Sequence, residues 1–220
     1  MLKLTISQLR SLVLGALMMG GFLALSLIAR LTAGGEGDSH TSGYALGLMV
    51  AYMVLIPFVV MLTSGSFGVR LALSMGAARR DLTGQVSVMN AVFCALLLAA
   101  MALVEEALRI WSGAPALPAA AWAGMLGVGL VGGAMGAAAG VMALRYPVRV
   151  VVLTVLGVCA VGVVLIIYVV AGFMLNFGPM ALLLQAGTAA VYGAAFAVLA
   201  ALWAIFTAAM HRLVKTAVVS

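Results

Sequence analysis

Few side chains in this sequence could take part in chemistry, and their spacing excludes most reactions. Glu105 and Glu106 are neighbours, and adjacent residues of a helix point about 100° apart, so they do not form a catalytic pair of carboxylates. We expect them to form a solvated outer cap on a helix. His40 and His211 lie at the margins of apolar stretches without a second metal ligand at useful spacing. The sequence therefore predicts no catalytic residue and no metal site.

Other enzyme classes are excluded by motif. A phosphate-binding loop needs Gly-x-x-x-x-Gly-Lys-Ser/Thr, but the two lysines, Lys3 and Lys215, follow Leu and Val. A His-Glu-x-x-His metalloprotease motif is absent, and no histidine lies deep enough to serve an intramembrane serine protease. Cys94 and Cys159 lie in apolar stretches, where a thiol behaves as a small hydrophobic group. We expect neither an enzyme nor a cofactor bound by this chain.

Polar residues concentrate in one short stretch, "LALSMGAARRDLTGQ", residues 71–85. Ser66 is a candidate N-cap for a short helix, and Gly76 is suited to end that helix. A second helix is expected from Ala78 through Arg79 into the next apolar segment. The prediction is a short helix across the membrane face that joins a longer helix through one turn, so that a push on it would move the longer helix.

The elements that position this stretch are membrane spans. Hydrophobic residues make up 66% of the chain and charged residues 7%, and the mean hydropathy is +1.31, which is typical of an integral membrane protein. About 20 apolar residues cross a bilayer as a helix. We predict an all-α protein, a single transmembrane domain over residues 1–220, with six spans at 11–31, 44–63, 85–104, 121–144, 150–172 and within 180–210.

Lysine and arginine favour the cytoplasmic side of short loops. With both termini cytoplasmic, only Arg30 and Arg109 lie outside. Nine basic residues are then inside: Lys3, Arg10, Arg70, Arg79, Arg80, Arg145, Arg149, Arg212 and Lys215. This favours a multi-pass protein of the inner (plasma) membrane with affinity for anionic lipid and no nucleic-acid partner. Residues 1–10 are expected to be an amphipathic interfacial segment that is retained rather than cleaved.

Small residues are concentrated in the fourth predicted span. Helices in lipid associate through close backbone contact at such positions, so we expect this span to be tightly packed. The small residues form two ladders, Gly129, Gly133 and Ala137, and Gly132, Gly136 and Gly140. No ionisable side chain lies near a span centre, which disfavours a proton-driven carrier. The neutral polar residues of the spans are expected to hydrogen-bond between helices: Asn90, Tyr52, Tyr192 and Gln185. A short re-entrant helix is expected to end near Gly187.

The polar stretch resembles the cytoplasmic loop of type-2 ATP-binding-cassette (ABC) permeases, which are six-span exporter subunits. Members commonly show Leu-Ser-x-Gly-x-x-Arg-Arg/Lys between spans two and three, and this chain reads Leu73-Ser74-Met75-Gly76-Ala77-Ala78-Arg79-Arg80. Ala78 departs from the Ser or Thr that relatives often carry there. The resemblance implies that loop 64–84 carries a coupling helix that docks on an ATPase. Leu73, Met75 and Gly76 would shape the docking surface, and Arg79, Arg80 and Asp81 would fix its register.

The resemblance further implies a separate P-loop ATPase that binds ATP and Mg²⁺, and a second permease, identical or similar. Short outer loops and a nearly uncharged interior favour an amphipathic, peptide or lipid-like cargo. Two other readings stay open: a non-transporting scaffold or sensor that recruits a partner through the same loop, and a small ATP-independent channel or carrier. Arg79 and Arg80 could also simply contact lipid phosphates, which would stabilise membrane binding by about 1 kcal/mol per residue. Such contact does not require the amphipathic run beside them, whose apolar face could instead fill a groove of a partner protein.

Overall fold

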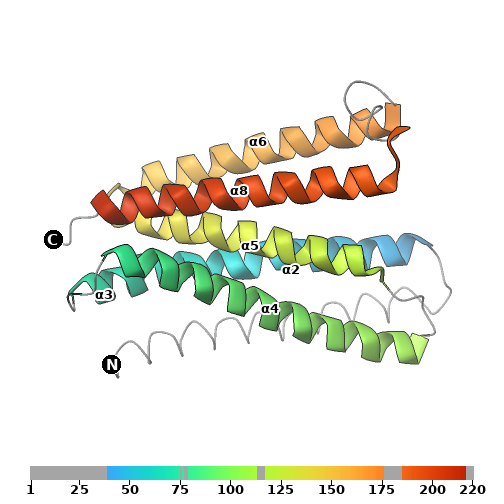
Figure 1. The fold of residues 1–220 in the computed structure, drawn as a ribbon, viewed down its shortest axis with the longest axis horizontal. Helices are drawn as coiled ribbons and strands as arrows, with labels where there is room; N and C mark the ends of the chain where they lie inside the picture. Colours follow the sequence, from blue (N-terminus) through green and yellow to red (C-terminus); the bar gives the residue numbers. More distant parts are fainter. Residues whose placement is uncertain (1–38, 75, 77–78, 113–116, 176–184, 217–220) are drawn as a thin grey trace.

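The computed structural model describes residues 39–74, 76, 79–112, 117–175 and 185–216. Every element in this part of the chain is helical (Figure 1). In chain order the elements are α2 (Ser39–Thr63), the π-helix η1 (Ser64–Gly68), α3 (Val69–Ser74), α4 (Arg79–Ser112), α5 (Ala119–Met142), α6 (Val148–Leu175) and α8 (Thr188–Thr216).

Four segments of these helices are long and apolar enough to cross a membrane: Met49–Ser74, Asp81–Ala107, Ala119–Met142 and Thr188–Thr216. A shorter apolar stretch, Val148–Gly162, begins α6. The described residues are therefore all-helical, as predicted, and their long apolar helices agree with the multi-pass membrane class predicted from composition. Five of the six predicted spans correspond to α2, α4, α5, α6 and α8. The predicted span 11–31, the interfacial segment 1–10 and most of the predicted re-entrant helix lie outside the described residues.

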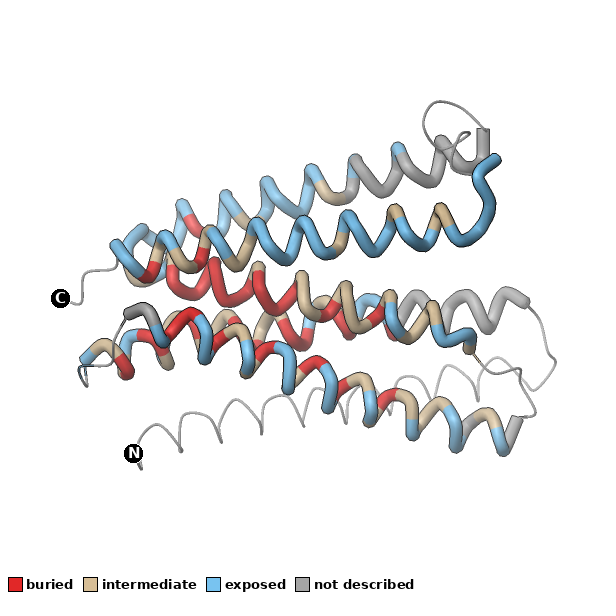
Figure 2. The backbone as a smooth tube through the Cα atoms, in the orientation of Figure 1, coloured by how far each residue is buried: buried red, intermediate tan, exposed pale blue. Residues whose placement is uncertain are grey.

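The long helices α4, α5, α6 and α8 alternate in direction along the chain, so α5 and α8 run the same way (Figure 1). Helix α5 is the centre of the arrangement, because it packs against α2, α4 and α8 and its contact with α2 is the most extensive in the described part. Figure 2 shows the consequence: buried residues follow α5 and the sides of α2 and α4 that face it.

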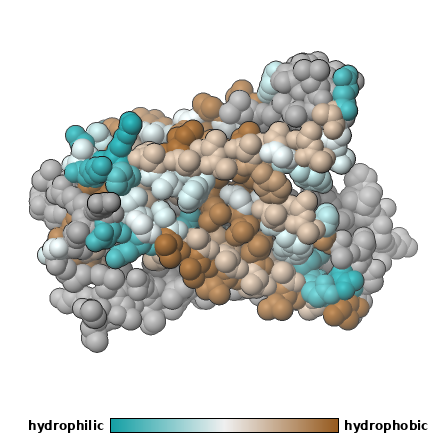
Figure 3. Space-filling view, viewed as in Figure 1, coloured by the Kyte–Doolittle hydropathy of each residue, from teal (hydrophilic) through white to brown (hydrophobic). Residues whose placement is uncertain are grey.

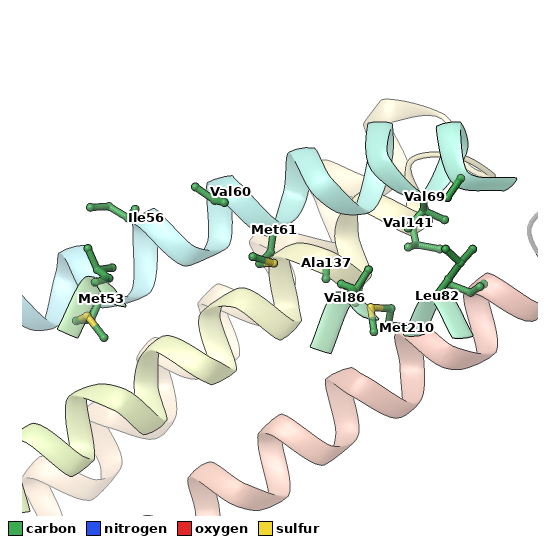
Figure 4. Packing of buried hydrophobic residues seen from close by; sticks show 14 of the residues in the cluster. Met53, Ile56, Val60, Met61, Val69, Leu82, Val86, Ala137, Val141 and Met210 are labelled. Carbon is green, nitrogen blue, oxygen red and sulfur yellow. The ribbon is translucent and has the colours of Figure 1, made fainter. Parts of the chain in front are cut away.

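The core consists of aliphatic side chains and methionines from five helices. Figure 4 shows Met61 of α2 directed toward Ala137 of α5, whereas Ile56 and Val60 lie on the opposite side of α2. Val69, Val141, Leu82, Val86 and Met210 belong to the same cluster. Met53, Met61 and Val141 are almost fully buried. In lipid such a core is held by close packing, since the surrounding acyl chains are as apolar as the side chains.

Glycines allow α5 to approach α2 at backbone distance. A Cβ added at Gly132 would lie 2.8 Å from the carbonyl oxygen of Val54, and similar clashes would arise between Gly136 and Phe58 and between Gly140 and Leu62. On η1, a Cβ added at Gly65 would clash with the carbonyl oxygen of Ala137 on α5. One ladder of the fourth span, Gly132, Gly136 and Gly140, thus lies along the backbone of α2.

The second ladder of α5 is directed at other partners. A Cβ added at Gly129 would lie 2.9 Å from Cε of Met53, and a Cβ at Gly133 would overlap the side-chain amide of Asn90 on α4. Asn90 is almost fully buried, and its Nδ2 donates a hydrogen bond of 3.0 Å to the carbonyl oxygen of Leu130. Its Oδ1 accepts one from Sγ of Cys94 at 3.4 Å. The prediction that Asn90 hydrogen-bonds between helices is confirmed.

The outer surface of the bundle is apolar, as a membrane requires. Exposed large hydrophobic side chains follow α4, α6 and α8, among them Leu103, Leu153 and Ile205. Figure 3 shows apolar side chains over the middle of the molecule and hydrophilic ones toward its ends. Of the α6 side chains that the structure describes, Val151 alone is buried, and the packing of α6 on α5 is slight. The long apolar face of α6 is therefore suited to contact lipid.

The expected cytoplasmic loop 64–84 differs from the structure in its first half. Ser66 does not cap a new helix: it lies inside η1, and its Oγ donates to the carbonyl oxygens of Leu62 (2.9 Å) and Thr63 (3.2 Å). Helix α2 continues through η1 into α3, so the short helix is an extension of the second span rather than a separate segment lying across the membrane face. Gly65, one of the residues that resemble a break, is a packing residue, since it lies against the backbone of Ala137 on α5.

Candidate functional site

The candidate site is the corner where α3 meets α4, formed by α3, Gly76 and the first turns of α4. Gly76 has φ of 81°, in the left-handed region, and its N–H donates to the carbonyl oxygen of Leu73 at 3.1 Å. Glycine is the residue that adopts this conformation without a steric penalty. The predicted helix stop at Gly76 is therefore confirmed, and α4 begins at Arg79, one residue after the expected start.

Apolar residues hold this corner, called the α3–α4 corner below, against the bundle. Val69 and Ala72 of α3 are buried, as are Leu82 and Val86 of α4, and all four belong to the main core cluster. Leu73 is half-buried and packs against the same cluster. Leu73 therefore has less surface to offer a docking partner than the sequence suggests. The core therefore holds both sides of the corner.

The exposed side of the corner carries small and charged residues. Ser74, Gly76 and Asp81 are exposed, and so is Arg70 one turn before Ser74. Asp81 lies in the first turn of α4, where a carboxylate interacts favourably with the helix dipole. Arg79 and Arg80 begin α4, but the structure does not describe their side chains, and Met75 lies outside the described residues. The docking roles of these three residues stay predictions.

A polar contact joins the corner to the end of α8. Thr83 Oγ1 and His211 Nδ1 are hydrogen-bonded at 3.2 Å, and Thr83 is buried. The two residues are 128 positions apart in sequence, and no spacing pattern links them. The sequence indicates only that both are polar residues at the same end of predicted spans. The contact closes α8 against the start of α4.

Basic residues gather at this same end of the bundle. Arg145 and Arg149 lie at the turn between α5 and α6, and Arg212 and Lys215 lie in the last turns of α8. The Arg145 guanidinium lies 5.4 Å from the centroid of the Tyr146 ring, at a distance suited to a cation–π contact. These four basic side chains are exposed. These four positions, which are predicted to share one side of the membrane, thus lie at one end of the described bundle, where α5 and α8 end and α6 begins (Figure 1).

The opposite end carries the two acidic neighbours near the end of α4. Arg109 donates through Nε to Oε2 of Glu106 at 2.8 Å, and a second bond joins its Nη2 to the same carboxylate. Glu106 is exposed and Glu105 is half-buried. Such an exposed pair one helical turn apart contributes little to the stability of the helix, because water screens it. The pair is thus an ion pair on a helix end, as the cap interpretation expects, and its members are not arranged for catalysis.

Within the described residues, no group of three His, Cys, Asp or Glu side chains could hold a metal ion. No protein-family model, curated protein or solved structure matches the chain. Composition and architecture therefore define its class: the described residues form an all-helical bundle with several helices that could span a membrane, and its basic end carries the turn between α3 and α4.

Proposed function

We propose that this chain is the membrane-spanning permease subunit of an ATP-driven ABC exporter, and that a separate P-loop ATPase docks on the α3–α4 corner. The observation that supports the proposal is the construction of the corner. A left-handed glycine joins two membrane helices, both of which are anchored in one core cluster, at the end of the bundle that carries the basic residues. The motif that resembles the coupling loop of ABC permeases, residues 73–80, lies at this point.

In this proposal the corner transmits movement rather than chemistry. ATP and Mg²⁺ belong to the partner ATPase, and this chain catalyses no reaction. Closure of an ATPase dimer would displace the corner. The continuous helix of α2, η1 and α3 would then tilt together with α4, because Val69 of α3 and Leu82 of α4 lie in the same core. Two such permeases would enclose the path of an amphipathic, peptide or lipid-like cargo. The basic end would face the cytoplasm of a six-span protein in the inner membrane, in line with the positive-inside rule.

Co-purification from mild detergent tests the proposal. The wild-type chain is compared with a variant in which Arg79→Glu and Arg80→Glu reverse the charge of the corner. The matched control carries Arg145→Glu and Arg149→Glu, which reverse the same number of charges at the same end of the bundle but at another turn. We expect the wild type and the control to retain a P-loop ATPase with measurable ATP hydrolysis, and the corner variant to lose it.

Three results would contradict this expectation in different ways. Equal loss of the ATPase in the corner variant and in the control would show that Arg79 and Arg80 act only through the general charge of this end of the bundle and form no specific docking site. A wild-type protein that purifies alone, without ATP hydrolysis, would favour the channel or carrier. Capture of a partner that is not an ATPase, lost only in the corner variant, would favour the scaffold or sensor.

A further inference from the structure

Two polar side chains of α4, Thr83 and Asn90, are seven residues apart and therefore share one face of the helix. They bind different neighbours. Asn90 donates to the carbonyl oxygen of Leu130 on α5 at 3.0 Å, whereas Thr83 is hydrogen-bonded to His211 on α8 at 3.2 Å. About 10 Å of helix separates the two levels. Helix α4 is thus held to α5 inside the bundle and to α8 near the corner.

The two contacts differ in what their loss would leave behind. Asn90 is 2% exposed, and its amide would find no water if α4 left α5, so this contact is costly to break. His211 is half-buried and lies near the end of a membrane helix, where water can replace Thr83 as the partner of its ring. The contact at Asn90 is therefore suited to be permanent, and the contact at Thr83 to be reversible.

The hydroxyl of Thr83 also has a second acceptor on its own helix. Five other hydroxyls of the described helices donate to a carbonyl oxygen three or four residues earlier in the chain: Thr63, Ser66, Ser74, Thr154 and Thr216. For Thr83 the carbonyl oxygens at this spacing belong to Arg79 and Arg80, in the first turn of α4. A helical threonine reaches such an oxygen by rotation about χ1. Thr83 can therefore leave His211 without leaving its hydroxyl unpaired.

Apolar side chains close the interface between α4 and α8 around the Thr83–His211 contact. Leu82 and Val86 of α4 and Met210 and Val214 of α8 are buried and belong to the main core cluster. Figure 4 shows Val86 and Met210 in the same part of this cluster. Toward their other ends α4 and α8 diverge (Figure 1). The contact between these two helices is therefore concentrated at the end that carries the corner.

We propose that the Thr83–His211 contact is a reversible latch. In the closed state, which is the state of this structure, it holds α8 against the first turns of α4. In the open state the Thr83 hydroxyl turns to the carbonyl oxygen of Arg79, water binds the ring of His211, and α4 pivots about Asn90 so that its corner end leaves α8. Opening is a property of this chain alone, but its use to connect the α3–α4 corner with a transport path rests on the proposed function.

Distances between two spin labels, measured by electron paramagnetic resonance, test the latch. Cys159→Ala removes the exposed thiol, and Cys94 is buried. Labels at Gln85→Cys on α4 and Thr216→Cys at the end of α8, both exposed positions, report the separation of the two helices at the corner end. The full chain is placed in lipid nanodiscs and diluted with unlabelled protein, so that the distances measured lie within one chain.

Three substitutions change the latch. Thr83→Val removes the hydroxyl and His211→Leu removes its partner, whereas His211→Gln keeps a hydrogen-bonding group. The matched control, Thr154→Val, removes a hydroxyl that is bonded within α6. We expect mainly one short distance in the wild type, in the control and in His211→Gln. In Thr83→Val and His211→Leu the population of a second, longer distance should rise about fivefold, equivalent to about 1 kcal/mol, the net contribution of an ordinary hydrogen bond.

A double variant and a second label pair separate a latch from a merely stabilising contact. Thr83→Val combined with His211→Leu should open no further than either single variant, because the same bond is lost in all three. Labels at Ala107→Cys and Thr188→Cys, exposed positions beyond Asn90, should come closer when the first pair separates, since α4 pivots.

Two kinds of result would overturn the proposal. A single distance in every variant, or openings that add in the double variant, would show that Thr83 and His211 form no latch. Lengthening of both label distances in Thr83→Val would mean that α4 moves as a whole and does not pivot about Asn90. Because the assay contains no ATPase, its result is independent of whether the co-purification succeeds.

Discussion

At the scale of single residues, the contact between α5 and α2 depends on the absence of one carbon atom. A Cβ at Gly136 would lie 2.8 Å from the carbonyl carbon of Phe58 and closer still to its oxygen. The obstacle is backbone on both sides, so neither helix can yield by changing a rotamer. Overpacking of this kind costs about 1–3 kcal/mol, and occasionally more.

We therefore expect Gly136→Ala to lower the free energy of unfolding by about 2 kcal/mol, measured by denaturation in mixed micelles. Gly157→Ala on α6 is the matched control, because the added methyl group there meets no atom within 4 Å and alanine is a better helix former than glycine. This control should be neutral or slightly stabilising. Equal stability of the two variants would show that the α2–α5 contact is looser than described.

Asn90 and Gly133 form a pair whose effects should not add. Gly133→Ala places a methyl group on the Asn90 side-chain amide, and Asn90→Ala removes the interhelical hydrogen bond to Leu130, which is worth about 0.6–2 kcal/mol in a membrane. We expect each single variant to be less stable than the wild type. The double variant should be more stable than the sum of the two losses predicts, because the methyl group then occupies space left by the amide. Additive losses in this double-mutant cycle would contradict the contact.

Gly76 is constrained by conformation and not by space. A Cβ there meets no atom within 4 Å, but φ is 81°. A left-handed backbone costs an alanine about 1–2 kcal/mol, whereas asparagine tolerates it better. We expect Gly76→Ala to lower the thermal stability of the purified chain and Gly76→Asn to retain most of it. If both behave alike, the turn has another conformation in the membrane.

At the scale of elements, η1 keeps two parts of one long helix in phase. A π-turn is equivalent to an α-helix with one inserted residue. Met61, Gly65 and Val69 are buried at regular intervals of four, which in a purely α-helical segment would drift around the helix by about 40° per step. The extra residue in η1 compensates for this rotation, so that Val69 of α3 lies on the same face of the long helix as Met61 of α2, and both face the core.

A deletion tests this role of η1. Removal of the exposed Phe67 should convert η1 into regular α-helix and leave Val69 and Ala72 buried, so the variant should fold with a stability close to that of the wild type. Removal of Leu55, equally exposed but within regular α2, should rotate one half of the helix by about 100° relative to the other and prevent correct packing. Yields of monodisperse protein and denaturation curves compare the two. Loss of folding on deletion of Phe67 would contradict the insertion model.

The sequence predicted the existence of the helices better than their connections. Continuous apolar runs identify α2, α4, α5, α6 and α8, since little else can cross a bilayer. The Ser and Gly residues of η1 were interpreted as a loop because they break helices in water. In lipid the same residues bring helices together, and only the partner position Ala137 distinguishes the two roles. The Thr83–His211 contact could not be predicted, because it joins residues that no local pattern connects.

At the scale of the whole molecule, the two ends of the bundle differ in charge, and this difference predicts its orientation. The end with the α3–α4 corner carries Arg70, Arg145, Arg149, Arg212 and Lys215 on exposed side chains, whereas the opposite end carries Glu106 paired with Arg109. Basic residues in short loops are retained on the cytoplasmic side during insertion. An ATPase that uses cytoplasmic ATP would need the corner on that side.

Cysteine labelling in intact cells checks this orientation. Cys159→Ala removes the exposed thiol, while the buried Cys94 can stay. Ser74→Cys and Thr216→Cys then report on the basic end, and Ala107→Cys and Thr188→Cys on the other end; all four positions are exposed. We expect a membrane-impermeant maleimide to label the second pair in intact cells and the first pair only after permeabilisation. Labelling of Ser74→Cys in intact cells would place the corner outside, out of reach of any ATPase in the cytoplasm, and would rule out the exporter mechanism together with the orientation.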